Sequence, residues 1–106
     1  MSDHELDELK REFLVEAEEK VREMQTALQA GRNLDSLQRL GYLAHQLKGS
    51  GGSYGYQRIS ADAAEIEKAV EAAGDGSLDA NAEQKIQQHV GNLRAEIETR
   101  ARELSV

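Results

Sequence analysis

Four segments of this chain carry apolar residues at repeated spacings of three and four, and short links that contain glycine join them. This spacing places the apolar side chains on one face of a helix, whereas a strand alternates with a period of two. The chain contains no proline, the residue that most strongly interrupts a helix. We therefore predict four helices, over about residues 3–30, 34–54, 57–73 and 80–104.

The links between the predicted helices decide how the helices pack. They read GRN, GYQ and GDGSLDA in chain order, and links this short make neighbouring helices run antiparallel. We predict an all-α fold, an antiparallel up-down four-helix bundle that occupies residues 1–106 as one domain. An elongated antiparallel coiled coil is the alternative, and the three tight breaks between the segments disfavour it.

The composition excludes several classes of function. The chain has no cysteine, which rules out disulfide bonds, thiol catalysis and cysteine-ligated metals. Its net charge of −7 argues against nucleic acids and anionic membranes as partners. No apolar run approaches the roughly 18 residues of a membrane span, and the acidic start MSDHELDELK is unlike a secretory signal. We expect a cytoplasmic protein.

The stretch AHQLKGSGGSYG, residues 44–55, is the least expected part of the second predicted helix. Four of its twelve residues are glycine, and Gly41 precedes it. Each glycine in a helix interior costs about 1 kcal/mol relative to alanine. The stretch therefore weakens the helix around one histidine, His45, and one lysine, Lys48, which suggests that the glycines serve a purpose other than folding.

His45 is predicted to lie on the solvent side of this helix. At about 100° per residue, it lies roughly 130° from the centre of the apolar stripe. That stripe is formed by Leu37, Leu40, Ala44, Leu47, Gly51 and Tyr54. The residues that share the surface of His45 lie three, four or seven positions away: Gly41, Tyr42, Lys48, Gly49 and Gly52. We interpret three of these as glycines that clear the helix face, so that a large partner can approach the imidazole closely.

The chemistry that fits this surface is phosphoryl transfer. A neutral imidazole is a competent nucleophile at cellular pH, and the Lys48 ammonium, one turn away, can neutralise an anion carried there. Phosphoryl transfer asks for little more than an in-line nucleophile and charge neutralisation. A lone surface histidine usually has no function, so the interpretation depends on its combination with Lys48 and the glycines.

The same stretch resembles a known motif. Histidine-containing phosphotransfer (HPt) domains of bacterial two-component phosphorelays read roughly H-x-L-K-G-small-small-x-x-aromatic/aliphatic-G. The positions that match it here are His45, Leu47, Lys48, Gly49, Ser50, Gly51, Tyr54 and Gly55. The length and the four-helix layout also resemble an isolated HPt domain, so the resemblance covers essentially the whole chain.

The resemblance implies a reversible phosphocarrier without an ATP site or kinase activity of its own. His45 would carry the phosphoryl group on Nε2 between aspartates of response-regulator receiver domains, with a hybrid or other histidine kinase upstream. Lys48 would stabilise the phosphoryl oxygens, and Gly49 and Gly52 would admit the receiver. Magnesium would be bound by the receiver, and no cofactor by this chain.

Two further residues follow from the resemblance and the spacing. In chemotaxis-type members, a glutamate on the next helix hydrogen-bonds the other ring nitrogen of the histidine, and Glu67 lies at the matching offset from His45. The alternative is that Glu67 is an ordinary flanking glutamate. Gln38, one turn before Gly41 on the same face, is a candidate for receiver docking together with Tyr42.

The remaining histidines, His4 and His89, do not match the motif and are expected to be structural or inert, and no metal-ligand spacing includes them.

Two alternatives to a phosphorelay carrier stay open. One is the N-terminal phosphoacceptor domain of a chemotaxis-type histidine kinase, although the initial methionine favours a free-standing protein. The other is a helical module that binds receivers without chemistry. We expect a monomer, since no extra apolar stripe is evident.

Overall fold

The computed structural model of this chain describes residues 2–30, 33–74 and 78–104, and all of its regular structure there is helical. The helices are α1 (Asp3–Gln29), α2 (Leu34–Ser53), α3 (Gln57–Ala73) and α4 (Ala80–Leu104). These bounds differ from the predicted ones by at most one residue at each end. The parts of the predicted links at residues 31–32 and 75–77, and residues 1 and 105–106 of the predicted domain, lie outside the described residues.

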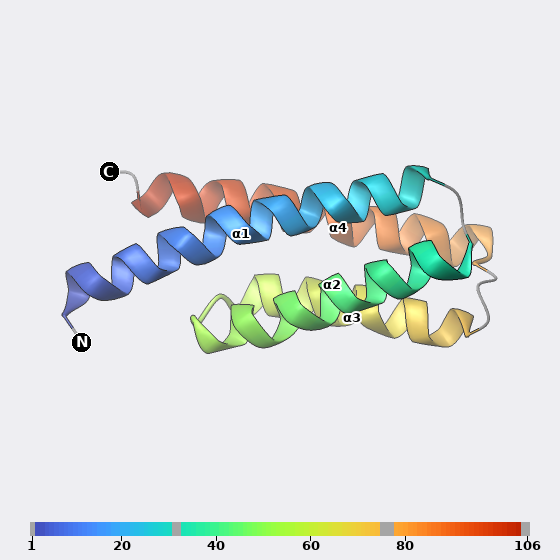
Figure 1. The fold of residues 1–106 in the computed structure, drawn as a ribbon, viewed down its shortest axis with the longest axis horizontal. Helices are drawn as coiled ribbons and strands as arrows, with labels where there is room; N and C mark the ends of the chain where they lie inside the picture. Colours follow the sequence, from blue (N-terminus) through green and yellow to red (C-terminus); the bar gives the residue numbers. More distant parts are fainter. Residues whose placement is uncertain (1, 31–32, 75–77, 105–106) are drawn as a thin grey trace.

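The four helices form the predicted antiparallel up-down bundle. Successive helices reverse direction, and both ends of the chain lie at the same end of the bundle (Figure 1). Each helix packs against two others, so that α1 and α3 both contact α2 and α4. The bundle measures 46 × 20 × 19 Å, and α1 and α4 extend beyond the turn that joins α2 to α3 (Figure 1). Among the described residues, none of the helices is apolar over a length that could cross a membrane.

Local sequence signals explain where the helices begin. The side chains of Ser2, Asn33 and Asp79 accept hydrogen bonds from the backbone N–H groups of Glu5, Ser36 and Ala82. Such N-caps satisfy backbone donors that the first helical turn leaves without a partner.

The turn between α2 and α3 depends on one glycine. Gly55 has a φ of 83°, a conformation that residues with a Cβ rarely adopt. Phe13 of α1 then stacks on Tyr54 at 5.0 Å and on Tyr56 at 5.9 Å between ring centroids, which packs this turn against α1.

The core is apolar throughout, and in the described part of the chain no polar or charged residue is fully buried. It runs the length of the bundle and takes side chains from all four helices. Its members are Phe13, Leu14, Ala17, Val21, Met24, Leu37, Leu40, Leu43, Ala44, Leu47, Ile59, Ala63, Ile66, Ile86, Val90, Leu93 and Ile97. Burial of Leu37, Leu40, Ala44, Leu47 and Gly51 confirms most of the predicted stripe of α2, whereas its last member, Tyr54, is only partly buried. Leu43, which was not part of the predicted stripe, is buried as well.

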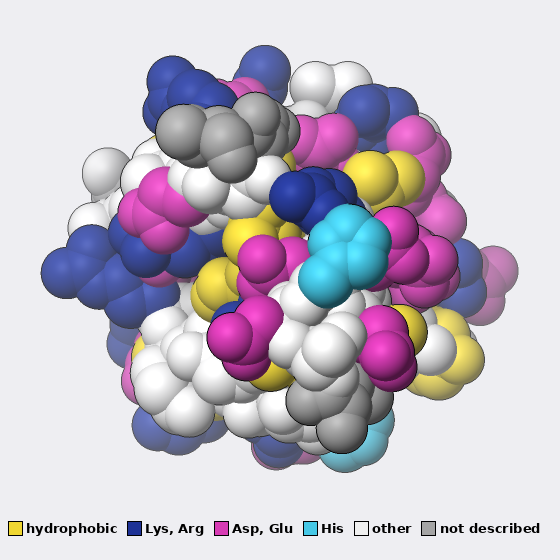
Figure 2. All heavy atoms as spheres, turned by 90° about the vertical axis from the view of Figure 1, so that its left-hand side faces the viewer, with side chains coloured by type: hydrophobic (Ala, Val, Ile, Leu, Met, Phe, Trp, Pro, Cys, Tyr) yellow, Lys and Arg dark blue, Asp and Glu magenta, His cyan; other side chains and the backbone are white. Residues whose placement is uncertain are grey.

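The end of the bundle that carries both chain termini has a mixed surface. Acidic and basic side chains alternate there around a small apolar area (Figure 2). This end therefore offers no extended patch of a single charge.

We predict that Leu40→Ala lowers the free energy of unfolding by about 2–5 kcal/mol, because it leaves a cavity where a fully buried side chain packs. Leu34→Ala is the matched control in the same helix. Its side chain is 47% exposed, so the change should stay within about 0.5 kcal/mol. Urea unfolding followed by circular dichroism measures both, and equal effects would contradict the assigned core.

Candidate functional site

His45 lies on the solvent-facing side of α2, as its angular position predicted. Its side chain is 65% exposed, whereas the adjacent Ala44 and the nearby Leu47 are buried in the core. The buried pair fixes the rotation of α2, and this rotation holds the imidazole at the surface.

Glu67 of α3 brings His45 and Lys48 together. One of its carboxylate oxygens, Oε2, lies 2.7 Å from Nδ1 of His45, and the other, Oε1, accepts a hydrogen bond of 2.5 Å from Nζ of Lys48. The Glu67 side chain is only 14% exposed, while that of Lys48 is 40% exposed. A single carboxylate from the neighbouring helix thus binds both residues that the motif singled out.

This geometry distinguishes the two ring nitrogens of His45. An ionised carboxylate can only accept hydrogen bonds. Nδ1 therefore carries the proton and donates a hydrogen bond to Glu67. In a neutral ring Nε2 then has the free lone pair. Because the ring is largely exposed, that nitrogen is the nucleophilic atom available to a partner.

The electrostatics keep Glu67 ionised. The hydrogen bond from the Lys48 ammonium is the largest influence and lowers the pKa of Glu67 below its ordinary value. Partial burial acts in the opposite direction, and the hydrogen bond from His45 lowers the pKa further. The carboxylate is therefore charged at neutral pH and remains an acceptor for the imidazole.

Lys48 lies one turn from His45 on α2, as its spacing predicted, and its ammonium forms an ion pair with Glu67 in the unmodified site. This pair was not evident from the spacing of residues, because Lys48 and Glu67 are separated by 19 positions and lie on different helices. The role of Lys48 in neutralising a phosphoryl group stays a prediction.

The three glycines predicted to clear the helix face around His45 do not all face open space. A Cβ at Gly49 would meet nothing within 4 Å, so Gly49 does open the surface next to His45. A Cβ at Gly41 would lie 3.1 Å from Cγ1 of Val70, and one at Gly52 would lie 3.6 Å from Oγ of Ser60. These two positions face α3. Gly41 in particular does not clear the face around the imidazole, because Val70 fills that space.

The other predicted docking residues remain on the surface of α2. Gln38 is exposed, and Tyr42 is 52% exposed with its hydroxyl accepting a hydrogen bond from Gln46. The Arg39 guanidinium lies over the Tyr42 ring at 5.5 Å. Val15 of α1, 63% exposed, lines a shallow groove together with Tyr42. The sequence pattern did not identify Val15, whose signal is that of an apolar residue outside the buried face of α1.

Ser60 of α3 is another contact that sequence reasoning missed. Its hydroxyl donates a hydrogen bond of 2.8 Å to the backbone carbonyl of Lys48. Lys48 is therefore held by α3 through both its carbonyl and its ammonium. A serine near the start of a helix carries no signal that points to a partner 12 positions away.

The other two histidines have different surroundings. His4 is exposed near the start of α1, and its Nε2 lies 3.5 Å from Oε1 of Glu8. Nδ1 of His89 on α4 lies 2.8 Å from Oδ1 of Asp62 on α3, and both side chains are less than one-fifth exposed. His89 therefore ties two helices together and does not present its ring to a partner as His45 does.

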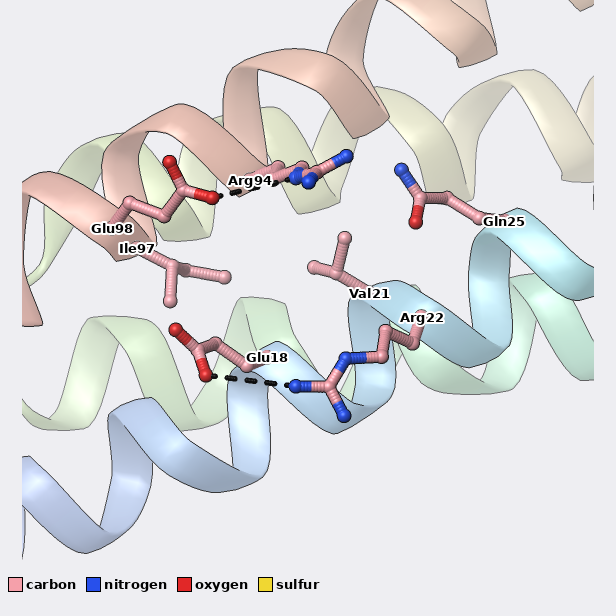
Figure 3. A pocket seen from close by; sticks show the side chains of 7 residues that line it. All are labelled: Glu18, Val21, Arg22, Gln25, Arg94, Ile97 and Glu98. Atoms are coloured by element: carbon pink, nitrogen blue, oxygen red, sulfur yellow. Dashed lines mark hydrogen bonds and ion pairs between the residues drawn. The ribbon is translucent and has the colours of Figure 1, made fainter.

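A groove between α1 and α4 lies on helices that do not carry His45, Lys48 or Glu67 (Figure 3). Val21 and Ile97 contribute apolar surface, and the charged side chains around them pair along their own helices, Glu18 with Arg22 and Arg94 with Glu98 (Figure 3). In the part of the chain that the structure describes, no cluster of three or more potential ligands could hold a metal ion.

Comparison with known families supports the resemblance of the motif. The family model described as the Hpt domain matches residues 8–98, a range that includes His45, Lys48 and Glu67. No curated protein and no solved structure matches the chain.

The lowered pKa of Glu67 predicts how the site responds to acid. Because its pKa is lower in the folded than in the unfolded chain, the carboxylate contributes stability that is fully present above the unfolded pKa. That contribution is lost as the pH falls from the ordinary pKa of a glutamate, about 4.3, through the lower folded pKa. The difference in unfolding free energy between the wild type and Glu67→Gln should therefore shrink between about pH 5 and pH 3.

Urea unfolding across this range measures the difference. Glu71→Gln, an exposed glutamate on the same helix, is the control and should show a smaller dependence on pH. A difference for Glu67→Gln that stays constant down to about pH 3 would contradict the pairing of Glu67 with Lys48 and His45.

Proposed function

The chain belongs to the Hpt domain family, whose members act in histidine phosphotransfer of two-component systems, and on that premise we propose that His45 is its phosphoacceptor. In this proposal Nε2 of His45 accepts a phosphoryl group from the aspartyl phosphate of one receiver domain and passes it to the aspartate of another. The chain would have no kinase activity of its own. Magnesium would be bound by the receiver, and this chain would contribute no metal or cofactor.

One observation carries this proposal: the carboxylate of Glu67 binds Nδ1 of an exposed imidazole and leaves Nε2 as the available nucleophile. The proton on Nδ1 does not have to move before the reaction. The ring is already in the tautomer that attack from Nε2 requires.

The transfer step balances without an additional acid or base. The lone pair of Nε2 attacks phosphorus as the bond from phosphorus to the aspartyl oxygen breaks, and the aspartate leaves as a carboxylate. The imidazole becomes cationic, because both nitrogens now carry a substituent. The Glu67 carboxylate, 2.7 Å from Nδ1, stabilises that charge through the hydrogen bond it already accepts. The reverse reaction follows the same path.

Lys48 is proposed to exchange partners during this step. In the unmodified site its ammonium binds Glu67, the same carboxylate that would face the cationic ring after transfer. Lys48 is one turn from His45 and 40% exposed, so its flexible side chain can turn to the phosphoryl oxygens. The exchange would give each charge in the phosphorylated site an opposite charge as its partner.

The surface beside His45 is proposed to bind the receiver. Gly49 supports this most directly, because a Cβ there would enter open space. Tyr42 and Gln38 extend the exposed surface on the same helix. Gly52 lies on the side of α2 that faces Ser60 of α3, next to this surface. A receiver would cover the convex face of α2, in keeping with a site that is not a concave small-molecule pocket.

Two further roles are alternatives. A phosphoacceptor domain of a chemotaxis-type kinase is favoured by the His45–Glu67 pair, which the resemblance attributes to that group. It would take its phosphoryl group from a catalytic domain with ATP and not from a receiver. A module without chemistry would bind receivers and remain unlabelled.

We predict that His45→Gln abolishes phosphorylation while the fold remains intact, because the side chain is 65% exposed and lies outside the core. The measurement is transfer of label from a panel of receiver domains charged with a small phosphodonor. A parallel reaction uses a histidine kinase catalytic domain with ATP. The label should be acid-labile and alkali-stable, as expected for phosphohistidine. His4→Gln is the control and should label normally, and labelled His45→Gln would refute the assignment.

We predict that Gly49→Leu blocks transfer without lowering stability. The position is open and helical, so the side chain adds bulk to the docking face and removes a glycine from a helix interior. Transfer from a receiver should fall at least about tenfold, which corresponds to about 1.4 kcal/mol. Gly91→Leu, a similarly open glycine on α4, is the matched control. Normal transfer to the Gly49 variant would show that the receiver binds elsewhere.

A further inference from the structure

α2 approaches α3 closely at two places, and in both places α2 carries glycine. A Cβ at Gly41 would lie 3.1 Å from Cγ1 of Val70. A Cβ at Gly51 would lie 3.1 Å from Cγ2 of Ile59 and 3.2 Å from the backbone nitrogen of Ser60. All three distances are shorter than ordinary van der Waals contacts, so the spacing of the two helices depends on the absence of a Cβ at Gly41 and Gly51.

Glu67 lies between these two contacts along α3. Val70 follows it by three positions and Ser60 precedes it by seven, so all three residues share one face of the helix. The hydroxyl of Ser60 donates to the carbonyl of Lys48, which fixes the register of α3 along α2. Glu67 therefore lies on α3 between two close contacts with α2, one at Val70 and one at Ser60.

From this arrangement we propose that Gly41 is a positioning residue for the phosphoacceptor. By letting Val70 approach α2, it sets the spacing at which the Glu67 carboxylate reaches Nδ1 of His45 at 2.7 Å. The link to phosphoryl transfer rests on the proposed function. The control of the imidazole tautomer does not, because it concerns only the unmodified site.

Val70 cannot easily move away from a side chain at position 41. Valine is branched at Cβ and is restricted at χ1, so a methyl group at position 41 pushes against a stiff side chain. The adjustment falls on α3 within one turn of Glu67. A hydrogen bond of 2.7 Å weakens quickly when its atoms move apart or out of line. Gly49 has no such neighbour, which separates the role of Gly41 from that of Gly49.

The test uses the full chain and four variants: Gly41→Ala, Val70→Ala, the double variant and Gly91→Ala. In the double variant Cγ1 of Val70 is gone, and its Cβ, 3.8 Å from the new methyl group, makes only an ordinary contact. The ¹⁵N signals of His45 at about pH 8 report which ring nitrogen carries the proton in the neutral ring. The initial rate of phosphoryl uptake from a charged receiver is measured in parallel, and circular dichroism reports folding.

We expect Gly41→Ala to shift the His45 signals towards protonation on Nε2 and to slow phosphoryl uptake by roughly tenfold, since small misplacements of catalytic groups have effects of this size or larger. The double variant should restore both readouts. Val70→Ala and Gly91→Ala should leave the tautomer as it is in the wild type. An unchanged tautomer in folded Gly41→Ala would overturn the proposal, whether or not uptake falls. So would a double variant that does not recover.

The design separates this proposal from the proposed function. If His45 is never labelled in the wild type, the proposed function fails. The ¹⁵N signals still decide the role of Gly41. If the wild type is labelled and Gly41→Ala keeps its tautomer but loses uptake, the phosphoacceptor stands and Gly41 acts through docking.

Discussion

The close packing of α3 against α2 is the constraint on which the site depends. His45 alone is an exposed imidazole on a convex helix, and α3 supplies the carboxylate that fixes its tautomer. α2 carries glycines at the close contacts, at about 1 kcal/mol each relative to alanine in a helix interior. The apolar core from all four helices is large enough to offset that loss. The stability of the whole bundle thus supports a locally weakened helix.

The charges of the site are arranged so that none is isolated. Glu67 is mostly buried and would be costly without a partner, and Lys48 compensates for that cost in the unmodified protein. A phosphoryl group would add negative charge beside Lys48 and a positive charge on the ring beside Glu67. The same two side chains can therefore balance both states. A carrier benefits from this balance, because a site that strongly favoured one state would not release the group again.

The sequence predicted most of what depends on a single helix. The spacing of Leu37, Leu40, Ala44 and Leu47 defined the buried face of α2, and the same rotation placed His45 in solvent. Relations between helices were harder to predict. Glu67 was identified only through the resemblance to chemotaxis-type members and its matching offset from His45, and the role given to Gly41 was wrong in its physical reason. An angular position on α2 tells which residues share a face, but not that α3 covers one edge of it.

The glycines around His45 consequently serve two purposes that their spacing on one helix does not separate. Gly49 faces open space, while Gly41 and Gly51 face Val70 and Ile59. Both uses exploit the missing Cβ, one for contact with a partner molecule and the other for contact within the bundle. The two uses also determine the surroundings of different nitrogens of the His45 ring. The open side leaves Nε2 accessible, and the packed side brings Glu67 to Nδ1. An imidazole held in this way is oriented by its own domain and exposed to another, which is what transfer between two proteins requires.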